Sequence, residues 1–464
     1  MLAAKIPSSS LDSETTQSDG SCLFLTIPSE ITAQIFTYCL PASISPPEID
    51  TAPLLLTRIC RDWRNLAQDS PELWTSLKID RAAIPVELIE TWLSRAQTLP
   101  LSLELEVSSW DDVPWNSAEV IVVFERHSQT WRDVALDLPF EQLYLFGESS
   151  HLHLPLLERL AVAIHELALE LPPLTAFQNA PALRRLSLSR DVLGTKMQLP
   201  WAQITSMEFG SGSLRPEDVL TILQFTPNVV KCSVTTHNDL ESVLPDVVAP
   251  FMFLTSLKLE TIVPEVMNIF DHISVPALQV LDLSSILFSG RELVRRLRPI
   301  LSQPAIRLRD LRIRIDGDKP READFLQVLE MQSALENFEL WEGSLGLLIA
   351  ICRRLTLSLS DGSPVLLPHL RSFSASPHIY PAAEITTTFP VMLDALVDAL
   401  SSRWAAPSGS CTRIRDCGLS WSGAMTDDLD NIVEAFRPRR AELIALGINM
   451  SLLSLSAFGS KFTL

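Results

Sequence analysis

A short leucine-rich pattern recurs along most of this chain, and this recurrence constrains the fold more than any other feature. The unit is P-x-L-x-x-L-x-L, and it stands clearly in seven segments and more weakly in three others. Successive units begin 21 to 35 residues apart. Self-similarity at a step of this size is typical of a solenoid, in which each unit packs on its neighbours. The first apolar positions of the ten units are Trp131, Leu157, Leu183, Ile204, Val229, Leu254, Leu278, Leu308, Leu335 and Leu370.

Each unit predicts one short strand followed by a connecting segment. Apolar residues alternate after the second leucine, which is the period of a strand, whereas the segments 217–225 and 291–301 have apolar residues at helical spacing. A single copy of this pattern could arise by chance in a leucine-rich chain, but seven good copies in near register indicate a repeat. We therefore predict an α/β fold in which residues 81–388 form a curved, leucine-rich-repeat-like solenoid with a parallel sheet.

The two ends of the chain differ from the repeats. Residues 1–21 are rich in serine and threonine and have no hydrophobic period, so we expect a disordered tail. Residues 389–464 hold two helical stretches around a strand-like segment at 412–420. We expect this part to form a last repeat and a C-terminal cap over the open end of the core.

Residues 22–80 predict a small unit of three helices. Ile31, Ile35 and Cys39 recur every four residues in the first helix, and the positions 55, 59 and 63 do so in the second. A short third element, Pro71–Trp74, ends in bulky apolar side chains. A unit of this size needs a neighbour to be stable.

Composition and charge limit the classes of partner. The chain has 464 residues, a formal net charge of −19 and a pI near 4.9, which oppose binding that depends on neutralising phosphates. We expect neither nucleic acid nor membrane as a partner. The sequence contains no apolar run of the length of a signal peptide or a membrane span, and its seven cysteines lack CxxC spacing. We expect a soluble cytoplasmic or nuclear protein with reduced thiols, most of them buried.

The segments 27–41 and 54–79 resemble an F-box motif. The Leu-Pro pair that begins the motif in the family is Ile27-Pro28 here, and the loop before the second helix is longer than in many members. The remainder of the chain, with the segments 89–105 and 396–404 and the irregular leucine repeats, is similar to the expanded F-box family of mushroom-forming fungi. Further matches to the motif are Glu30, Ile31, Ile35, Phe36, Leu40, Pro41, Cys60, Arg61, Trp63, Arg64, Ala67, Pro71, Leu73 and Trp74.

The resemblance implies a non-catalytic substrate-recognition adaptor of a cullin-RING (SCF-type) ubiquitin ligase. In this family the F-box binds the ligase adaptor subunit, and through it a cullin, while the C-terminal domain binds a protein substrate. The resemblance places the adaptor contacts at Pro28, Ile31, Ile35, Leu56 and Trp63. For each of these residues the alternative is packing within the core of the motif, and we favour that alternative for Trp63 and for Phe36.

The inner face of the predicted sheet offers a second set of residues. Lys258, Asp282, Arg312 and Glu339 occupy the same position in four successive units, and Arg314 and Trp341 follow two residues later in the last two. Oppositely charged neighbours on adjacent strands can neutralise each other, and we favour this interpretation of the row. The functional alternative is a basic and aromatic patch that binds an acidic or phosphorylated segment of the substrate. Eight arginines between Arg291 and Arg314 favour this alternative slightly.

No pattern in the sequence indicates catalysis, a metal or a cofactor. His151 and His153 have the spacing of metal ligands, but we expect a surface pair because no set of ligands accompanies them. The chain contains neither a complete phosphate-binding loop nor a GxSxG segment. Besides the ligase adaptor, two hypotheses stay open: a leucine-rich-repeat scaffold that binds protein outside ubiquitination, and an enzyme whose site is assembled only in space.

Overall fold

The structure is a computed structural model of the chain. It describes residues 27–80, 84–106, 117–148, 152–164, 173–188, 197–210, 216–236, 249–261, 271–285, 290–315, 320–357, 365–377, 383–407, 411–422, 427–455 and 461–463. The predicted tail, 1–21, lies outside these residues, and so does His151.

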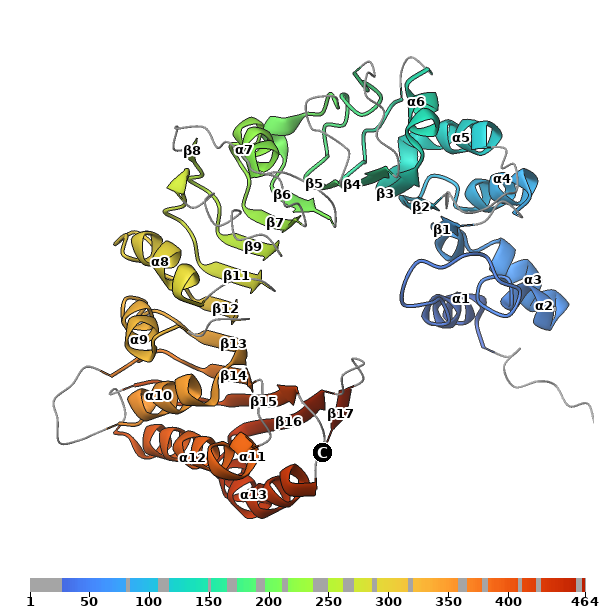
Figure 1. Cartoon of the computed structure of the whole chain (residues 1–464). Coiled ribbons are helices and arrows are strands. Elements are labelled where there is room, and N and C mark those ends of the chain that lie inside the picture. The colour runs from blue at the N-terminus through green and yellow to red at the C-terminus, as the bar shows by residue number, and fades with distance from the viewer. Residues whose placement is uncertain are drawn as a thin grey trace, which may run out of the picture.

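One large sheet runs through the described part of the chain and bends into an arc (Figure 1). Its strands follow each other in chain order, and every neighbouring pair is parallel except the last, β16 with β17, which is antiparallel. A second, two-stranded sheet joins β8 (Ala249–Pro250) and β10 (Ile273–Ser274). The strands of the large sheet are β1 (Ser76–Ile79), β2 (Leu101–Glu106), β3 (Trp131–Leu138), β4 (Arg159–Ile164), β5 (Arg185–Leu188), β6 (Ser206–Phe209), β7 (Lys231–Thr236), β9 (Ser256–Thr261), β11 (Val280–Ser285), β12 (Asp310–Arg314), β13 (Asn337–Gly343), β14 (Ser372–Pro377), β15 (Asp416–Ser422), β16 (Asn449–Leu455) and β17 (Lys461–Thr463).

The parallel sheet predicted from the repeated unit is confirmed. Each of the ten units contributes one strand, β3 to β7, β9 and β11 to β14, and these strands are neighbours in the same order. The leucines that defined the unit alternate toward the core: Leu257 and Leu259 are buried, while Lys258 between them points to the other face. The equivalent leucine, Leu281 on β11, pairs in register with Leu257, so each unit buries its leucines against those of the next.

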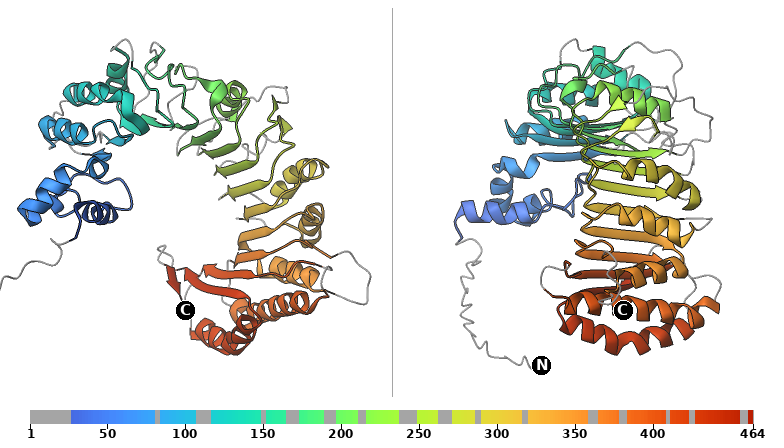
Figure 2. Two further views of the ribbon diagram at one scale, coloured as in Figure 1. Left: turned by 180° about the vertical axis from the view of Figure 1, so that it is seen from behind. Right: turned by 90° about the vertical axis from the view of Figure 1, so that its left-hand side faces the viewer.

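Helices cover the outer side of the arc, and the strands line its inner side (Figure 2). The two connecting segments that predicted helices form α7 and α8, and the C-terminal stretches form α12 and α13. Because successive strands are parallel, the described helices that connect them return along the outside, and they bury the outer face of the sheet. The helices of the array are α4 (Val86–Arg95), α5 (Ser117–Arg126), α6 (Phe140–Glu148), α7 (Pro216–Phe225), α8 (Gly290–Leu301), α9 (Glu322–Glu330), α10 (Leu345–Leu355), α11 (Ala383–Thr387), α12 (Phe389–Ala405) and α13 (Asp427–Ala445).

The N-terminal helices differ from the prediction in one respect. α1 (Ser29–Tyr38) and the 3-10 helix η2 (Pro71–Trp74) lie where the sequence placed them, but the second helix is divided into α2 (Leu56–Ile59) and α3 (Arg61–Gln68). Cys60 between them is extended, and its sulfur accepts a hydrogen bond from the backbone N–H of Trp63 at 3.4 Å. The break therefore supplies a cap for α3.

The sheet begins earlier than the predicted boundary at residue 81. β1 lies within the segment 22–80, and its Leu77 pairs in register with Leu103 of β2. The side chain of Trp74 is fully buried, and its ring contacts that of Trp92 on α4 at 4.9 Å between centroids. The N-terminal helices are therefore joined to the array through a continuous core.

A line of main-chain hydrogen bonds marks the edge of the sheet at which the strands begin, which we term the leading edge. The backbone N–H of each residue after the first in this line donates to the carbonyl of the equivalent residue on the strand before it. Residues in the line therefore occupy equivalent places in successive units. From the N-terminal to the C-terminal end, the line contains Arg132, Glu158, Arg184, Thr205, Val230, Thr255, Gln279, Arg309, Glu336, Arg371, Arg415 and Asn449.

None of the helices in the described ranges combines the length and the apolar character that crossing a lipid bilayer requires.

Candidate functional site

Apolar side chains are exposed on the N-terminal helices. On α1, Ile31 keeps 48% of its surface exposed and Ile35 is half-buried, and Pro28, the residue before the helix, is exposed. Ile31 and Ile35 are four residues apart and therefore share one face of the helix. Three of the five predicted adaptor contacts thus reach solvent at α1 and its N-terminal cap.

Leu56 was predicted as an adaptor contact, but the structure places it in the core, where only 3% of its surface is exposed. The exposed apolar residues of this region are instead Leu55 and Ile59, with 39% and 53% of their surface in solvent. Leu55 and Ile59 are four residues apart and share the exposed side, whereas Leu56 points away from that side into the core. The four-residue recurrence of positions 55 and 59 was visible in the sequence and could have identified them.

Trp63 packs against the core of the N-terminal helices. Its ring lies 4.9 Å from the fully buried ring of Phe36, and the rings are tilted by 55°. Trp63 itself is half-buried. It supports the N-terminal helices and presents only part of its surface.

The row on the inner face forms as its sequence positions predict. Asp282 lies in register with Lys258 on one side and Arg312 on the other, and Arg312 lies in register with Glu339. Arg312 bridges the two acids: its Nη1 lies 3.6 Å from Asp282 Oδ2, and its Nε lies 3.0 Å from Glu339 Oε2. This geometry favours the interpretation of the row as a ladder of alternating charge that neutralises itself.

Arg314 and Trp341 are less fully engaged than the row beside them. They lie in register on β12 and β13, and Trp341 exposes 37% of its surface. The nearest acid to Arg314 is Glu342, at 3.9 Å. Together with the row, Arg314 and Trp341 line a shallow hollow of about 390 Å³ on the inner face. All six residues predicted for substrate binding are therefore brought to one place.

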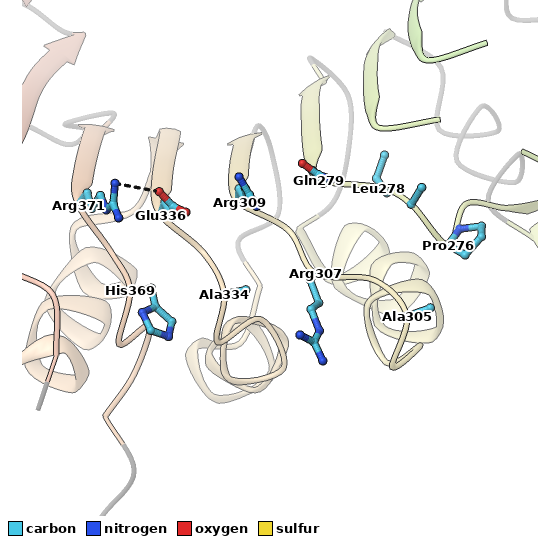
Figure 3. Close-up of a pocket in the computed structure, with 11 residues that line it drawn as sticks. Pro276, Leu278, Gln279, Ala305, Arg307, Arg309, Ala334, Glu336, His369 and Arg371 are labelled. Carbon is cyan, nitrogen blue, oxygen red and sulfur yellow. Dashed lines mark ion pairs between the residues drawn. The ribbon is translucent and has the colours of Figure 1, made fainter. Parts of the chain in front are cut away.

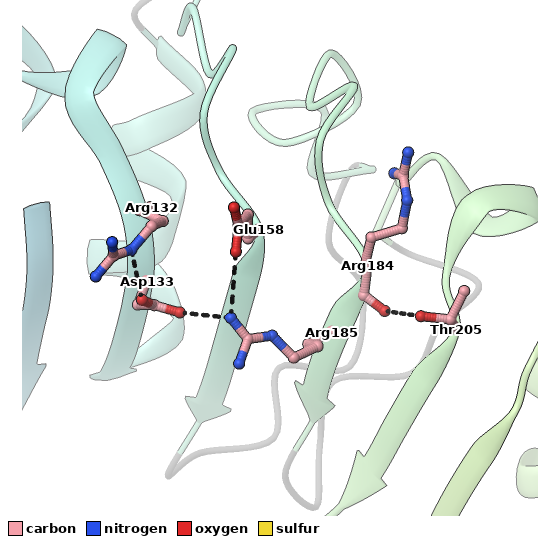
Figure 4. Close-up of polar contacts among 6 residues, drawn as sticks. All are labelled: Arg132, Asp133, Glu158, Arg184, Arg185 and Thr205. Atoms are coloured by element: carbon pink, nitrogen blue, oxygen red, sulfur yellow. Dashed lines mark hydrogen bonds and ion pairs between the residues drawn. The ribbon is translucent and has the colours of Figure 1, made fainter. Parts of the chain in front are cut away.

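A compact ionic cluster on the leading edge was not predicted from the sequence (Figure 4). Asp133 accepts from Arg132 Nε and from Arg185 Nη2, both at 3.1 Å, and Arg185 Nη2 also lies 3.5 Å from Glu158. Asp133 and Arg185 are 52 residues apart in the chain. Their proximity follows from the register of β3, β4 and β5, which local sequence patterns do not reveal.

The buried thiols have the properties of core residues. Cys232 and Cys417 are buried, and this burial raises the pKa of each thiol to about 12. Burial and a raised pKa are the properties of thiols that pack in an apolar core. Within the part of the chain that the structure describes, no three His, Cys, Asp or Glu side chains are grouped to hold a metal ion.

Comparison with known proteins finds no family model that matches the chain and no curated protein that is similar to it.

Proposed function

We propose that this protein is a substrate-recognition adaptor of a cullin-RING ubiquitin ligase, with an N-terminal F-box that binds the ligase adaptor subunit and a leucine-rich-repeat-like solenoid that binds a protein substrate. In this proposal the chain catalyses no reaction itself. Its role is to hold a substrate close to the ligase.

The observation that carries the proposal is the set of exposed apolar side chains on the N-terminal helices, within the segment that resembles an F-box. Ile31, Leu55 and Ile59 each leave between 39% and 53% of their surface in water. Removing such a half-exposed aliphatic side chain from water contributes about 1 kcal/mol. We assign these three side chains, with Pro28 and Ile35 beside Ile31, to the apolar centre of the proposed interface.

The array supports the second half of the proposal by its shape. Its inner face is a continuous parallel sheet, and the hollow around Arg314 and Trp341 opens on this face. An arginine and a tryptophan side by side are the residue types that contribute most at protein interfaces. We therefore place a substrate contact at Arg314 and Trp341 and treat Lys258, Asp282, Arg312 and Glu339 mainly as the ion-paired floor beside them.

A binding experiment with purified components tests the proposal. We expect the full chain to bind the purified adaptor subunit of a cullin-RING ligase in isothermal titration calorimetry. Changing Ile31→Ala and Ile59→Ala together should weaken this binding about tenfold or more, because both changes remove apolar contact area from the proposed interface.

A matched control separates the interface from a general loss of apolar surface. Val122 on α5 is 46% exposed, close to the value for Ile31, and lies outside the proposed interface. Val122→Ala should leave the affinity unchanged. A wild-type sample that is folded by circular dichroism and does not bind the adaptor subunit would refute the proposal and favour a scaffold that acts outside ubiquitination.

A further inference from the structure

Two adjoining hollows lie at the leading edge, where the C-terminal strands of the array begin. Their volumes are about 520 Å³ and about 660 Å³. Arg307, Ala334 and His369 line both hollows, which therefore form one groove. Figure 3 shows that its side chains come from successive strand beginnings. We term it the basic groove and define it by Arg307, Arg309, His369 and Arg371.

The positive charge of the basic groove is largely not neutralised by the chain. Arg307 and Arg309 are exposed, and neither forms an ion pair or a side-chain hydrogen bond with any residue in the described ranges. Arg371 Nη1 lies 3.4 Å from Glu336 Oε2, and Arg371 remains 62% exposed. Glu336 is the one acid among the described residues that line the two hollows. Three arginines thus face a single carboxylate.

The acid nearest to Arg309 in the sequence is engaged elsewhere. Asp310 accepts a hydrogen bond from the side-chain amide of Asn337, which lies in register with it on β13. This bond directs Asp310 along the sheet toward the next strand. It leaves Arg309 available for a ligand, because an exposed arginine without a partner keeps all its donors in water.

The shape of the groove suits an extended chain. Ala277, Ala305 and Ala334 line its floor and leave room for a backbone to approach. Arg309 and Arg371 are two strands apart in the main-chain line of the leading edge. Adjacent strands are about 4.8 Å apart, so the separation is about 10 Å, which an extended peptide covers in about three residues.

We propose that the basic groove binds an acidic peptide segment of a partner protein, in an extended conformation, with its carboxylates paired to Arg307, Arg309 and Arg371. Guanidinium groups form strong, charge-assisted hydrogen bonds with carboxylates. The groove is at the edge of the sheet, separate from the hollow on the inner face, and it would bind its peptide whether or not the N-terminal helices assemble into a ligase.

The overall charge of the chain favours a peptide over a nucleic acid. The formal net charge is −19, so a long polyanion would meet repulsion from most of the surface. Nucleic-acid binding gains its affinity from many phosphate contacts, and this groove offers three arginines. A short acidic segment can pair with these arginines and end before it reaches the acidic surroundings.

Fluorescence anisotropy with the full chain and no ligase subunit tests the proposal. The probe is a fluorescein-labelled peptide of alternating glutamate and alanine, with a glutamine–alanine peptide of equal length as reference. We expect the glutamate peptide to bind and the glutamine peptide not to bind. Arg307→Ala and Arg309→Ala together should weaken the binding about tenfold or more, because two charge-assisted pairs are lost.

The chain offers a control of equal net charge. Arg132→Ala and Arg185→Ala also remove two positive charges from the leading edge, but these arginines already pair with Asp133. This variant should bind the glutamate peptide as the wild type does, and thermal unfolding of both variants checks that they fold. Equal weakening by both double variants would overturn the proposal, because the attraction would then be long-range and not local. Tighter binding of a single-stranded oligonucleotide than of the glutamate peptide would overturn it as well.

Discussion

The leading edge carries arginines in both the N-terminal and the C-terminal half of the array, and the two groups have opposite environments. In the N-terminal stretch, Arg132 and Arg185 both bind Asp133 at 3.1 Å (Figure 4). In the C-terminal stretch, Arg307 and Arg309 make no such bond within the described residues (Figure 3). The first group is neutralised by its own chain, and the second is open to a ligand.

The cause of this difference lies on the neighbouring strands. An aspartate follows the arginine of the line in both stretches: Asp133 follows Arg132, and Asp310 follows Arg309. Asp133 has Arg185 within reach, two strands further along, whereas Asp310 has Asn337 directly beside it. The Asp133 carboxylate forms ion pairs, whereas the Asp310 carboxylate accepts a hydrogen bond from an amide. Register across the sheet therefore decides which arginines stay free, since the local sequence is nearly the same.

An arginine in the core is bound more completely by its own chain than either group on the leading edge. Changing it should have the largest effect on the free energy of unfolding. Arg403 is fully buried, and its guanidinium donates to the carbonyls of Leu355, Leu366 and Leu367. We expect Arg403→Met to lower the free energy of unfolding by about 3 kcal/mol or more, because three hydrogen bonds to main-chain carbonyls are lost in the core. Urea unfolding followed by circular dichroism measures this loss.

Arg413 is the control for this change, because its guanidinium lies over the ring of Trp404 at 5.1 Å and it is exposed. Arg413→Met should lower the free energy of unfolding by no more than about 1 kcal/mol. Equal losses in the two variants would contradict the role that we assign to Arg403.

A new acid beside Arg309 should make the C-terminal stretch resemble the N-terminal one. Gln279 precedes Arg309 in the main-chain line, at 2.7 Å between Arg309 N and Gln279 O, and its side chain is exposed. We expect Gln279→Glu to weaken binding of the glutamate–alanine peptide about five- to tenfold, because the new carboxylate pairs with Arg309 and repels the peptide. Anisotropy measures the effect. Gln279→Ala, which adds no charge, should bind as the wild type does, and equal weakening by both variants would speak against a role for Arg309.

The smallest effect on the free energy of unfolding is expected when the shared carboxylate is removed from the ionic cluster around Asp133. Asp133→Asn removes the carboxylate that Arg132 and Arg185 share. We expect a loss of about 0.5 to 1 kcal/mol in the free energy of unfolding, because ion pairs near the surface contribute little. Urea unfolding at low and high salt measures it, and the difference from wild type should shrink as salt rises. A loss above about 2 kcal/mol, or one that salt does not change, would mean that the cluster stabilises the fold in another way.

Much of the fold could be predicted because it depends on local patterns. The step between units and the alternation of leucines placed the strands β3 to β14, apart from the small pair β8 and β10, and this required no knowledge of distant residues. The row from Lys258 to Glu339 was also predicted, because all four units share the same register relative to their leucines. The roles proposed for this row and for the N-terminal helices stay predictions.

Other features could not be predicted, because they depend on contacts between distant residues or on a local break. Leu56 and Leu55 are adjacent and chemically identical, but the packing of α2 buries the first and exposes the second. The break at Cys60, which divides the predicted helix into α2 and α3, is not marked by a proline or a glycine in the sequence. The basic groove likewise depends on Arg307, Ala334 and the pair His369 and Arg371, which three successive units bring to one edge.

The sequence by itself therefore determined the repeated strand, the parallel order and the apolar core, because these follow from a periodic pattern that each unit carries within itself. Only the tertiary structure decided which charges neutralise each other and which remain free. An ion pair forms between side chains that register brings within about 4 Å, and these side chains come from units tens of residues apart. The same arginine and aspartate in sequence thus gave a closed cluster at Asp133 and an open groove at Arg309.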